Sequence, residues 1–112
     1  MANMGQSLRL EEVCDYVLNT LNEVLHGFSV DFRTALGSDR DAVLETFRQL
    51  ENRCADKTGV LLSSSINRTE AGLLLNCTRL CRKEFDPEEF ETRLGSSLDH
   101  AMLVEGALAE LV

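Results

Sequence analysis

The chain has 112 residues, of which 44% are hydrophobic and 27% charged, and its formal net charge is −8. This length fits one domain that builds its own core. The acidic balance repels phosphate backbones and no apolar run reaches the roughly 18 residues of a membrane-spanning helix, so neither nucleic-acid binding nor a membrane span is expected.

The first half of the chain predicts three helices. Residues 1–7 show no regular pattern and are expected to form a flexible lead-in. Apolar residues at helical spacing then run from Leu10 to Phe28 and predict a long amphipathic helix that Gly27 ends. Ser29 is a candidate N-cap for a short second helix ending at Gly37. A third helix is predicted to open at residue 38 or 39 and to break within residues 56–59.

The middle of the chain holds the least readable segment and the expected central helix. Residues 60–66 suit a strand, a helical turn or a buried loop equally well. Asn67 and Glu70 then form the pattern of a capping box, which predicts a fourth helix over residues 68–83. Because this segment is apolar on most of its sides, we expect other helices to surround it.

Residues 84–91 carry several signals of a helix start. Asp86 is placed as the N-cap, Pro87 falls at the first helical position, and Phe85 and Phe90 occupy the positions of a hydrophobic staple. A fifth helix is therefore predicted over residues 87–94, and a sixth from residue 96 or 97 onward. Together these segments predict an all-α fold, with residues 1–112 forming one compact domain of five or six short helices.

The cysteines are expected to be buried, reduced thiols. All four fall at apolar helical positions, and no signal-peptide pattern precedes them, which favours a reducing, cytoplasmic setting. Cys77 and Cys81 are the nearest approach to a chemical site, because their i, i+4 spacing supplies half of a tetrahedral zinc site or a redox pair. A bridge between them is disfavoured, since Cβ atoms at this spacing lie about 5–6 Å apart. A thiol-based redox or metal-binding protein is thus the alternative function, whereas the favoured interpretation includes no metal and no cofactor.

No catalytic grouping is found in the sequence. The serine run at residues 63–65 lacks the glycines and the sharp turn of a nucleophile elbow, and the two histidines stand alone. Phosphate-binding loops, calcium-binding loops and zinc-protease motifs are also missing. We therefore predict that the protein is not an enzyme, while a carrier with an apolar cavity stays open.

Negative charge gathers near the C-terminal end. Residues 84–112 contain eight acids and one base, Arg93, and so contribute −7 of the net −8. This face either aids solubility or binds a partner with a basic surface. The leading hypothesis is a non-catalytic protein–protein interaction module, or a small subunit of an intracellular assembly that forms homo- or hetero-oligomers. Its candidate partner-binding residues are Glu84, Glu88, Glu89, Glu91, Asp99 and Glu105.

The second half of the chain resembles one known family. From Ala71 it shows a long apolar helix, a polar break, a short helix capped by acids and ending in Leu94-Gly95, and a final helix. This order is similar to the N-terminal helical domain of COMMD proteins, whose opening helix would correspond to residues 10–25. The segment 28–66 is longer than the family's usual connection, and no segment here matches the C-terminal COMM domain. The resemblance implies a non-catalytic subunit of an assembly in endosomal trafficking, and it implies no site residues.

Overall fold

The computed structural model describes residues 8–27, 31–56 and 60–112. Within these ranges the chain forms seven helices and no strand, which confirms the all-α prediction. The count exceeds the expected five or six because residues 62–65 form a short helix of their own. The predicted lead-in at residues 1–7 and the predicted cap Ser29 lie outside the described residues. The helices are α1 (Leu10–His26), α2 (Phe32–Leu36), α3 (Arg40–Asp56), α4 (Leu62–Ser65), α5 (Arg68–Glu84), α6 (Pro87–Leu94) and α7 (Leu98–Leu111).

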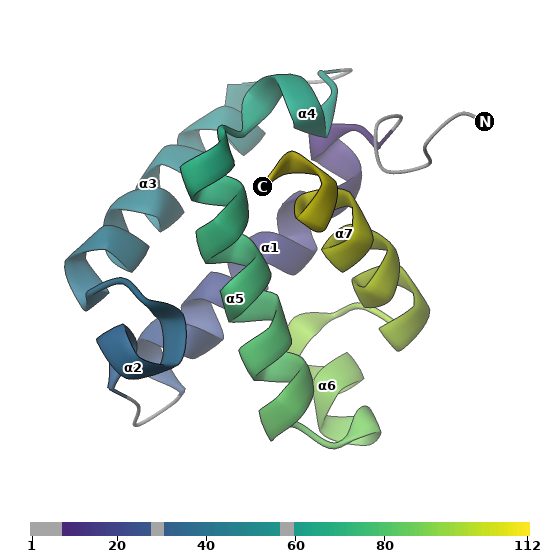
Figure 1. Cartoon of the computed structure of the whole chain (residues 1–112). Helices are drawn as coiled ribbons and strands as arrows, with labels where there is room; N and C mark the ends of the chain where they lie inside the picture. Colours follow the sequence, from purple (N-terminus) through teal and green to yellow (C-terminus); the bar gives the residue numbers. More distant parts are fainter. Residues whose placement is uncertain (1–7, 28–30, 57–59) are drawn as a thin grey trace.

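Helices α1 and α5 cross at the centre of the molecule (Figure 1). Helix α1 packs against α3, α5 and α6, and α5 packs against α1, α2 and α7. Helices α3 and α7 lie on opposite sides of this central pair (Figure 1). The expected central helix at residues 68–83 is therefore confirmed, but α1 shares its position: α1 buries nine residues and α5 buries eight.

Side-chain caps begin α5 and α6 where the sequence predicts them. The Asn67 side chain accepts the backbone N–H of Glu70 at 2.8 Å, and the Glu70 carboxylate accepts the N–H of Asn67 at 3.1 Å. The Asp86 carboxylate accepts the N–H of Glu89 at 2.8 Å. Helix α6 ends at Gly95, whose φ of 65° lies in the left-handed region that favours glycine.

Three other helix starts are decided by the structure. Asp31 caps α2 by accepting from the backbone N–H groups of residues 33 and 34. Of the two candidates for α3, Asp39 is the cap, since its carboxylate accepts the N–H of Ala42 at 2.9 Å. Ser97 caps α7 by accepting the N–H of His100 at 3.2 Å.

The ambiguous segment 60–66 docks on the start of α1. The N–H of Leu10 donates to the carbonyl of Val60 at 2.7 Å, and the N–H of Leu62 donates to the carbonyl of Leu8 at 2.8 Å. Leu62 and Ile66 are buried. These backbone bonds join positions that are far apart in sequence, so a local sequence pattern does not predict them.

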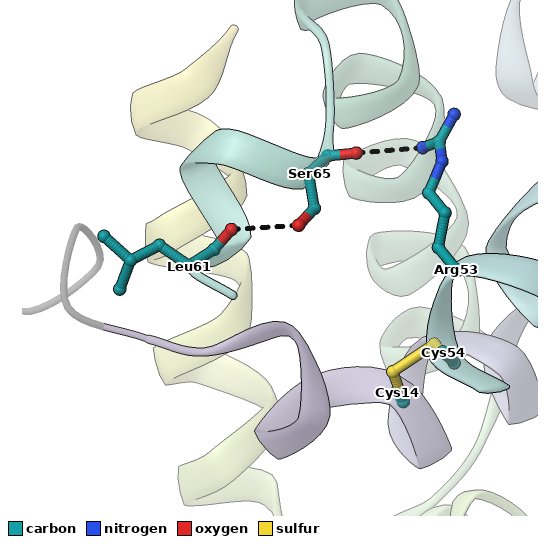
Figure 2. The surroundings of a disulfide bond; sticks show 5 residues. All are labelled: Cys14, Arg53, Cys54, Leu61 and Ser65. Carbon is teal, nitrogen blue, oxygen red and sulfur yellow. Dashed lines mark hydrogen bonds between the residues drawn. A yellow bond between two sulfur atoms is a disulfide. The ribbon is translucent and has the colours of Figure 1, made fainter. Parts of the chain in front are cut away.

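A disulfide joins Cys14 on α1 to Cys54 on α3, with the two sulfur atoms 2.14 Å apart (Figure 2). The expectation that all four cysteines are reduced thiols is therefore wrong for this pair. The reason is tertiary: α1 and α3 pack side by side and bring the two Cα atoms to 6.1 Å, which is within bridging range. Cys77 and Cys81 are free and buried, as expected.

Candidate partner-binding surface

Five of the six candidate carboxylates are exposed and lie around α6. We call this set the acidic surface; its members are Glu84 at the end of α5, Glu88, Glu89 and Glu91 on α6, and Asp99 in the first turn of α7. Local packing explains why α6 turns its acids outward. Phe90 and Leu94 of the same helix are fully buried against the interior, and the acids occupy the remaining sides.

The single base of this region is engaged within the acidic surface. A terminal nitrogen of Arg93 lies 3.5 Å from the Glu23 carboxylate, and its Nε lies 3.7 Å from that of Glu89. Its guanidinium also lies 5.2 Å from the centre of the Phe85 ring. Across the described ranges Glu84, Glu88, Glu91 and Asp99 form no ion pair, so their charges face solvent uncompensated.

A shallow hollow of about 400 Å³ lies on the outer side of α6. Its lining comes from Glu88, Glu89, Thr92 and Arg93, all on the same helix. Because one helix face lines it, the hollow is open to solvent and does not enclose a small molecule. Its polar lining suits contact with a second charged surface better than it suits an apolar ligand.

Glu105 does not belong to the acidic surface, which corrects its place among the candidates. It is 7% exposed and accepts two hydrogen bonds from Arg82, at 2.7 and 3.1 Å. The Nε of Arg79 lies 3.9 Å away. The sequence does contain a signal for this position, since Glu105 continues the buried stripe of Ala101 and Leu108 along α7.

Tyr16 is a buried polar residue that sequence reasoning did not single out. It is 2% exposed, and its hydroxyl finds no hydrogen-bond partner in the part of the chain that the structure describes. Burial raises the pKa of Tyr16 above its usual range, and the nearby charge of Glu105 adds to this shift. The ring lies 6.1 Å from that of Phe90 and 6.0 Å from that of His100. Tyr16 is therefore a neutral packing residue.

The buried thiols are held in a neutral state. Burial raises the pKa of Cys77 and the pKa of Cys81 to about 12, and both residues are fully buried. Nucleophilic and metal-binding chemistry require the thiolate. This environment favours a packing role for both side chains over the redox or metal site considered as the alternative.

Neither a metal centre nor a membrane span is found in the described residues. No three His, Cys, Asp or Glu side chains there gather as a metal ion would require. Separately, none of the helices in those ranges is both long enough and apolar enough to cross a bilayer.

Comparison with protein-family models, with curated proteins and with solved structures yields no match. The acidic surface and the buried clusters of this chain are therefore the basis for assigning a function.

Proposed function

We propose that this chain is a non-catalytic protein–protein interaction module and that its acidic surface binds a partner with a basic surface. The main support is the group of exposed carboxylates on α5, α6 and α7, of which Arg93 compensates only Glu89. Helix α6 carries three of them, Glu88, Glu89 and Glu91, and its position is fixed by the Asp86 cap at its start and by its buried apolar side.

The proposed binding depends on electrostatics in a specific way. An exposed ion pair contributes about 0–1 kcal/mol, so single charges matter little. A cluster of like charges raises the association rate and selects for a partner of opposite sign. We therefore expect association with the partner to weaken as the salt concentration rises.

The resemblance to the COMMD helical domain supports a more particular proposal. A non-catalytic subunit of an intracellular assembly in endosomal trafficking would use such a surface to contact a neighbouring subunit. Homo-oligomerisation is less favoured by this surface, since two copies would bring the same carboxylates together.

The test compares two triple variants that each remove three negative charges. One neutralises unpaired acids of the acidic surface, Glu84→Gln, Glu88→Gln and Glu91→Gln. The matched control neutralises exposed acids elsewhere, Asp15→Asn, Asp41→Asn and Glu51→Gln. Both are used in quantitative affinity capture from native extract at low and high salt, with circular dichroism to verify folding.

We expect a stoichiometric partner to be retained by the wild-type chain and by the control variant, and to be lost by the acidic-surface variant and at high salt. Equal recovery by the two triple variants, or recovery that salt does not affect, would contradict the role of the acidic surface. A strictly monomeric chain with no stoichiometric partner would contradict the interaction module itself.

A further inference from the structure

The two cysteines of the disulfide differ in their exposure to solvent. Cys14 lies on α1 and is 8% exposed, whereas Cys54 is partly exposed and lies in the last turn of α3 (Figure 2). The other two cysteines, Cys77 and Cys81, are fully buried and unpaired. Cys54 is therefore the cysteine that a reagent in solution reaches most easily.

Helix α3, which carries Cys54, buries fewer side chains than α1 does. Among its described side chains only Val43 and Leu50 are buried, whereas α1, of the same length, buries nine. Its main packing partner is α1. Near its end, Arg53 donates to the carbonyl of Ser65 at 3.0 Å (Figure 2). It also donates to the Glu70 carboxylate at 2.9 Å. Leu44 and Phe47 of α3 are partly buried against the core, and the disulfide adds a covalent link to this contact between α3 and α1.

We propose that the Cys14–Cys54 pair is a reversible redox site, opened by a small thiol or a dithiol reductant, whose state controls how firmly α3 is held against α1. The inference rests on the intracellular setting of the proposed function. In a reducing compartment a protein disulfide is usually transient and serves catalysis or redox sensing.

The exchange proceeds by two thiolate attacks. An external thiolate attacks the Sγ of Cys54, the bond between the two cysteines breaks, and its electron pair leaves on the Sγ of Cys14, which takes a proton from solvent. A second thiolate then attacks the external sulfur of this mixed disulfide, releases Cys54 as a thiolate that is protonated in turn, and forms the oxidised reductant. Two electrons and two protons pass to the protein for each reductant pair oxidised.

Exposure and helix position set the direction of this attack. Cys54 lies in the last turn of α3, where the partial negative charge disfavours a thiolate, whereas Cys14 is the fifth residue of α1 and lies beyond the first turn in which the opposite charge acts. The carboxylates of Glu11 and Glu12 in the first turn of α1 are engaged with Arg9. Because Cys54 is the more exposed cysteine of the pair, the external thiolate is expected to attack there, and the mixed disulfide is expected on Cys54.

Reduction is expected to loosen α3 alone. The contacts of α5 with α1 and α7 do not involve the disulfide, so the core stays folded. The contacts of Arg53 keep the end of α3 near its oxidised position, which allows the two sulfur atoms to pair again.

The experiment uses the whole wild-type chain, purified without reductant, in glutathione buffers of increasing reducing strength. Free thiols are trapped with an alkylating agent and located by mass spectrometry, and amide hydrogen exchange is measured on the same samples. We expect reversible reduction without denaturant, a glutathione adduct on Cys54, and amide exchange that is faster by roughly tenfold or more in α3 while α5 stays protected as part of the folded core.

Two single variants test the direction. Cys14→Ser leaves Cys54 as a lone, accessible thiol, whose thiolate should attack oxidised glutathione readily, forming the mixed disulfide and releasing one reduced glutathione. Cys54→Ser leaves the more buried Cys14, which should react more slowly. Both variants should show the fast α3 exchange of the reduced wild type without responding to reductant. If either variant fails to fold, the wild-type titration still decides the proposal.

Three outcomes would overturn the proposal. Resistance of the pair to strong reductant until the chain is unfolded would make it a permanent structural bridge. Alkylation of both cysteines, without any reductant, in protein prepared under oxidising conditions would show that the bridge does not form. The third outcome is exchange of α3 amides at the same rate in oxidised and reduced protein.

Discussion

Glu105 shows how the surroundings of one carboxylate decide its role. Its charge is nearly buried between α5 and α7, whereas Arg82, its main partner, keeps a side chain that is 42% exposed. Breaking a fully buried ion pair costs about 3–5 kcal/mol, mostly because a charge is left without a partner. Here the arginine that would be left behind is solvated, so the cost is smaller.

We expect Glu105→Ala to lower the free energy of unfolding by about 1–2 kcal/mol, measured by urea denaturation. Glu110→Ala is the control, because Glu110 is an exposed acid of the same helix without an ion pair in the described structure; it should stay within about 0.5 kcal/mol of wild type. Equal effects of the two substitutions would mean that the contact with Arg82 does not stabilise the fold.

The buried thiols of Cys77 and Cys81 predict a dependence of stability on pH. A thiol has an ordinary pKa of 9.0, and burial raises both values to about 12 in the folded chain. Below pH 9 both states keep their protons, so these groups add no pH dependence. Between about pH 9 and pH 12 the unfolded state loses protons that the folded state retains, and the free energy of unfolding therefore falls as pH rises.

Urea midpoints measured between pH 9 and pH 12 should decline more steeply for wild type than for the variant Cys77→Ala/Cys81→Ala. Parallel curves for the two proteins would contradict the role of the thiols.

At the scale of the elements, the glycine that ends α6 and the glycine inside α7 have different effects on the stability of their helices. Gly95 ends α6 with a φ of 65°, a conformation that other residues rarely adopt. Gly106 lies inside α7, and a Cβ atom built there would meet nothing within 4 Å in the described structure. The first glycine is needed for the turn, whereas the second only weakens its helix.

The two glycines therefore predict substitutions of opposite sign. Gly95→Ala should lower the free energy of unfolding by about 1 kcal/mol, because alanine is strained at positive φ. Gly106→Ala should raise it by about 0.5–1 kcal/mol through helix propensity. Thermal unfolding followed by circular dichroism measures both, and a destabilising Gly106→Ala would show that the outer side of α7 is more crowded than the structure indicates.

At the scale of the whole molecule, the disulfide closes a long loop of the chain. Cys14 and Cys54 are separated by 40 positions, and the bridge restricts the unfolded chain between α1 and α3. In the chain-entropy treatment, a loop of this length stabilises the folded state by about 4 kcal/mol.

The double variant Cys14→Ser/Cys54→Ser should therefore lose up to about 4 kcal/mol of unfolding free energy relative to the oxidised wild type. Urea denaturation with and without reductant measures the loss. Reduced wild type should match the variant, and the variant itself should not respond to reductant. A variant as stable as the oxidised protein would show that the bridge contributes nothing to the fold.

Local sequence patterns predicted most of the fold. The stripes of α1 and α5 and the caps Asn67 and Asp86 all involve residues within about four positions of one another, which is the range of helical contacts. Ser29 was the predicted N-cap of α2, whereas Asp31 caps it in the structure. Two candidates each stayed open for α3 and α7, because neighbouring residues there both have capping side chains. Residues 60–66 stayed open among a strand, a helical turn and a buried loop, because backbone bonds to the start of α1 position α4.

The acidic surface could be predicted only in part. Exposed carboxylates around α6 follow from the helix pattern, which turns Phe90 and Leu94 inward. Glu105 was misplaced because clustered charge was taken as exposed, although its position on the buried stripe of α7 indicated otherwise. Whether the hollow beside Thr92 and Arg93 is open or covered depends on which helices pack over α6. Local sequence patterns do not predict this packing.

The amino-acid sequence by itself determined the helical segments, their main caps and the excess of negative charge near the C-terminal end, because each depends on residues close together along the chain. Only the tertiary structure decided that Cys14 pairs with Cys54 and that Glu105 faces Arg82, at separations of 40 and 23 positions. Such pairs form when packing of the apolar sides selects which helices become neighbours, and that selection depends on the whole core at once.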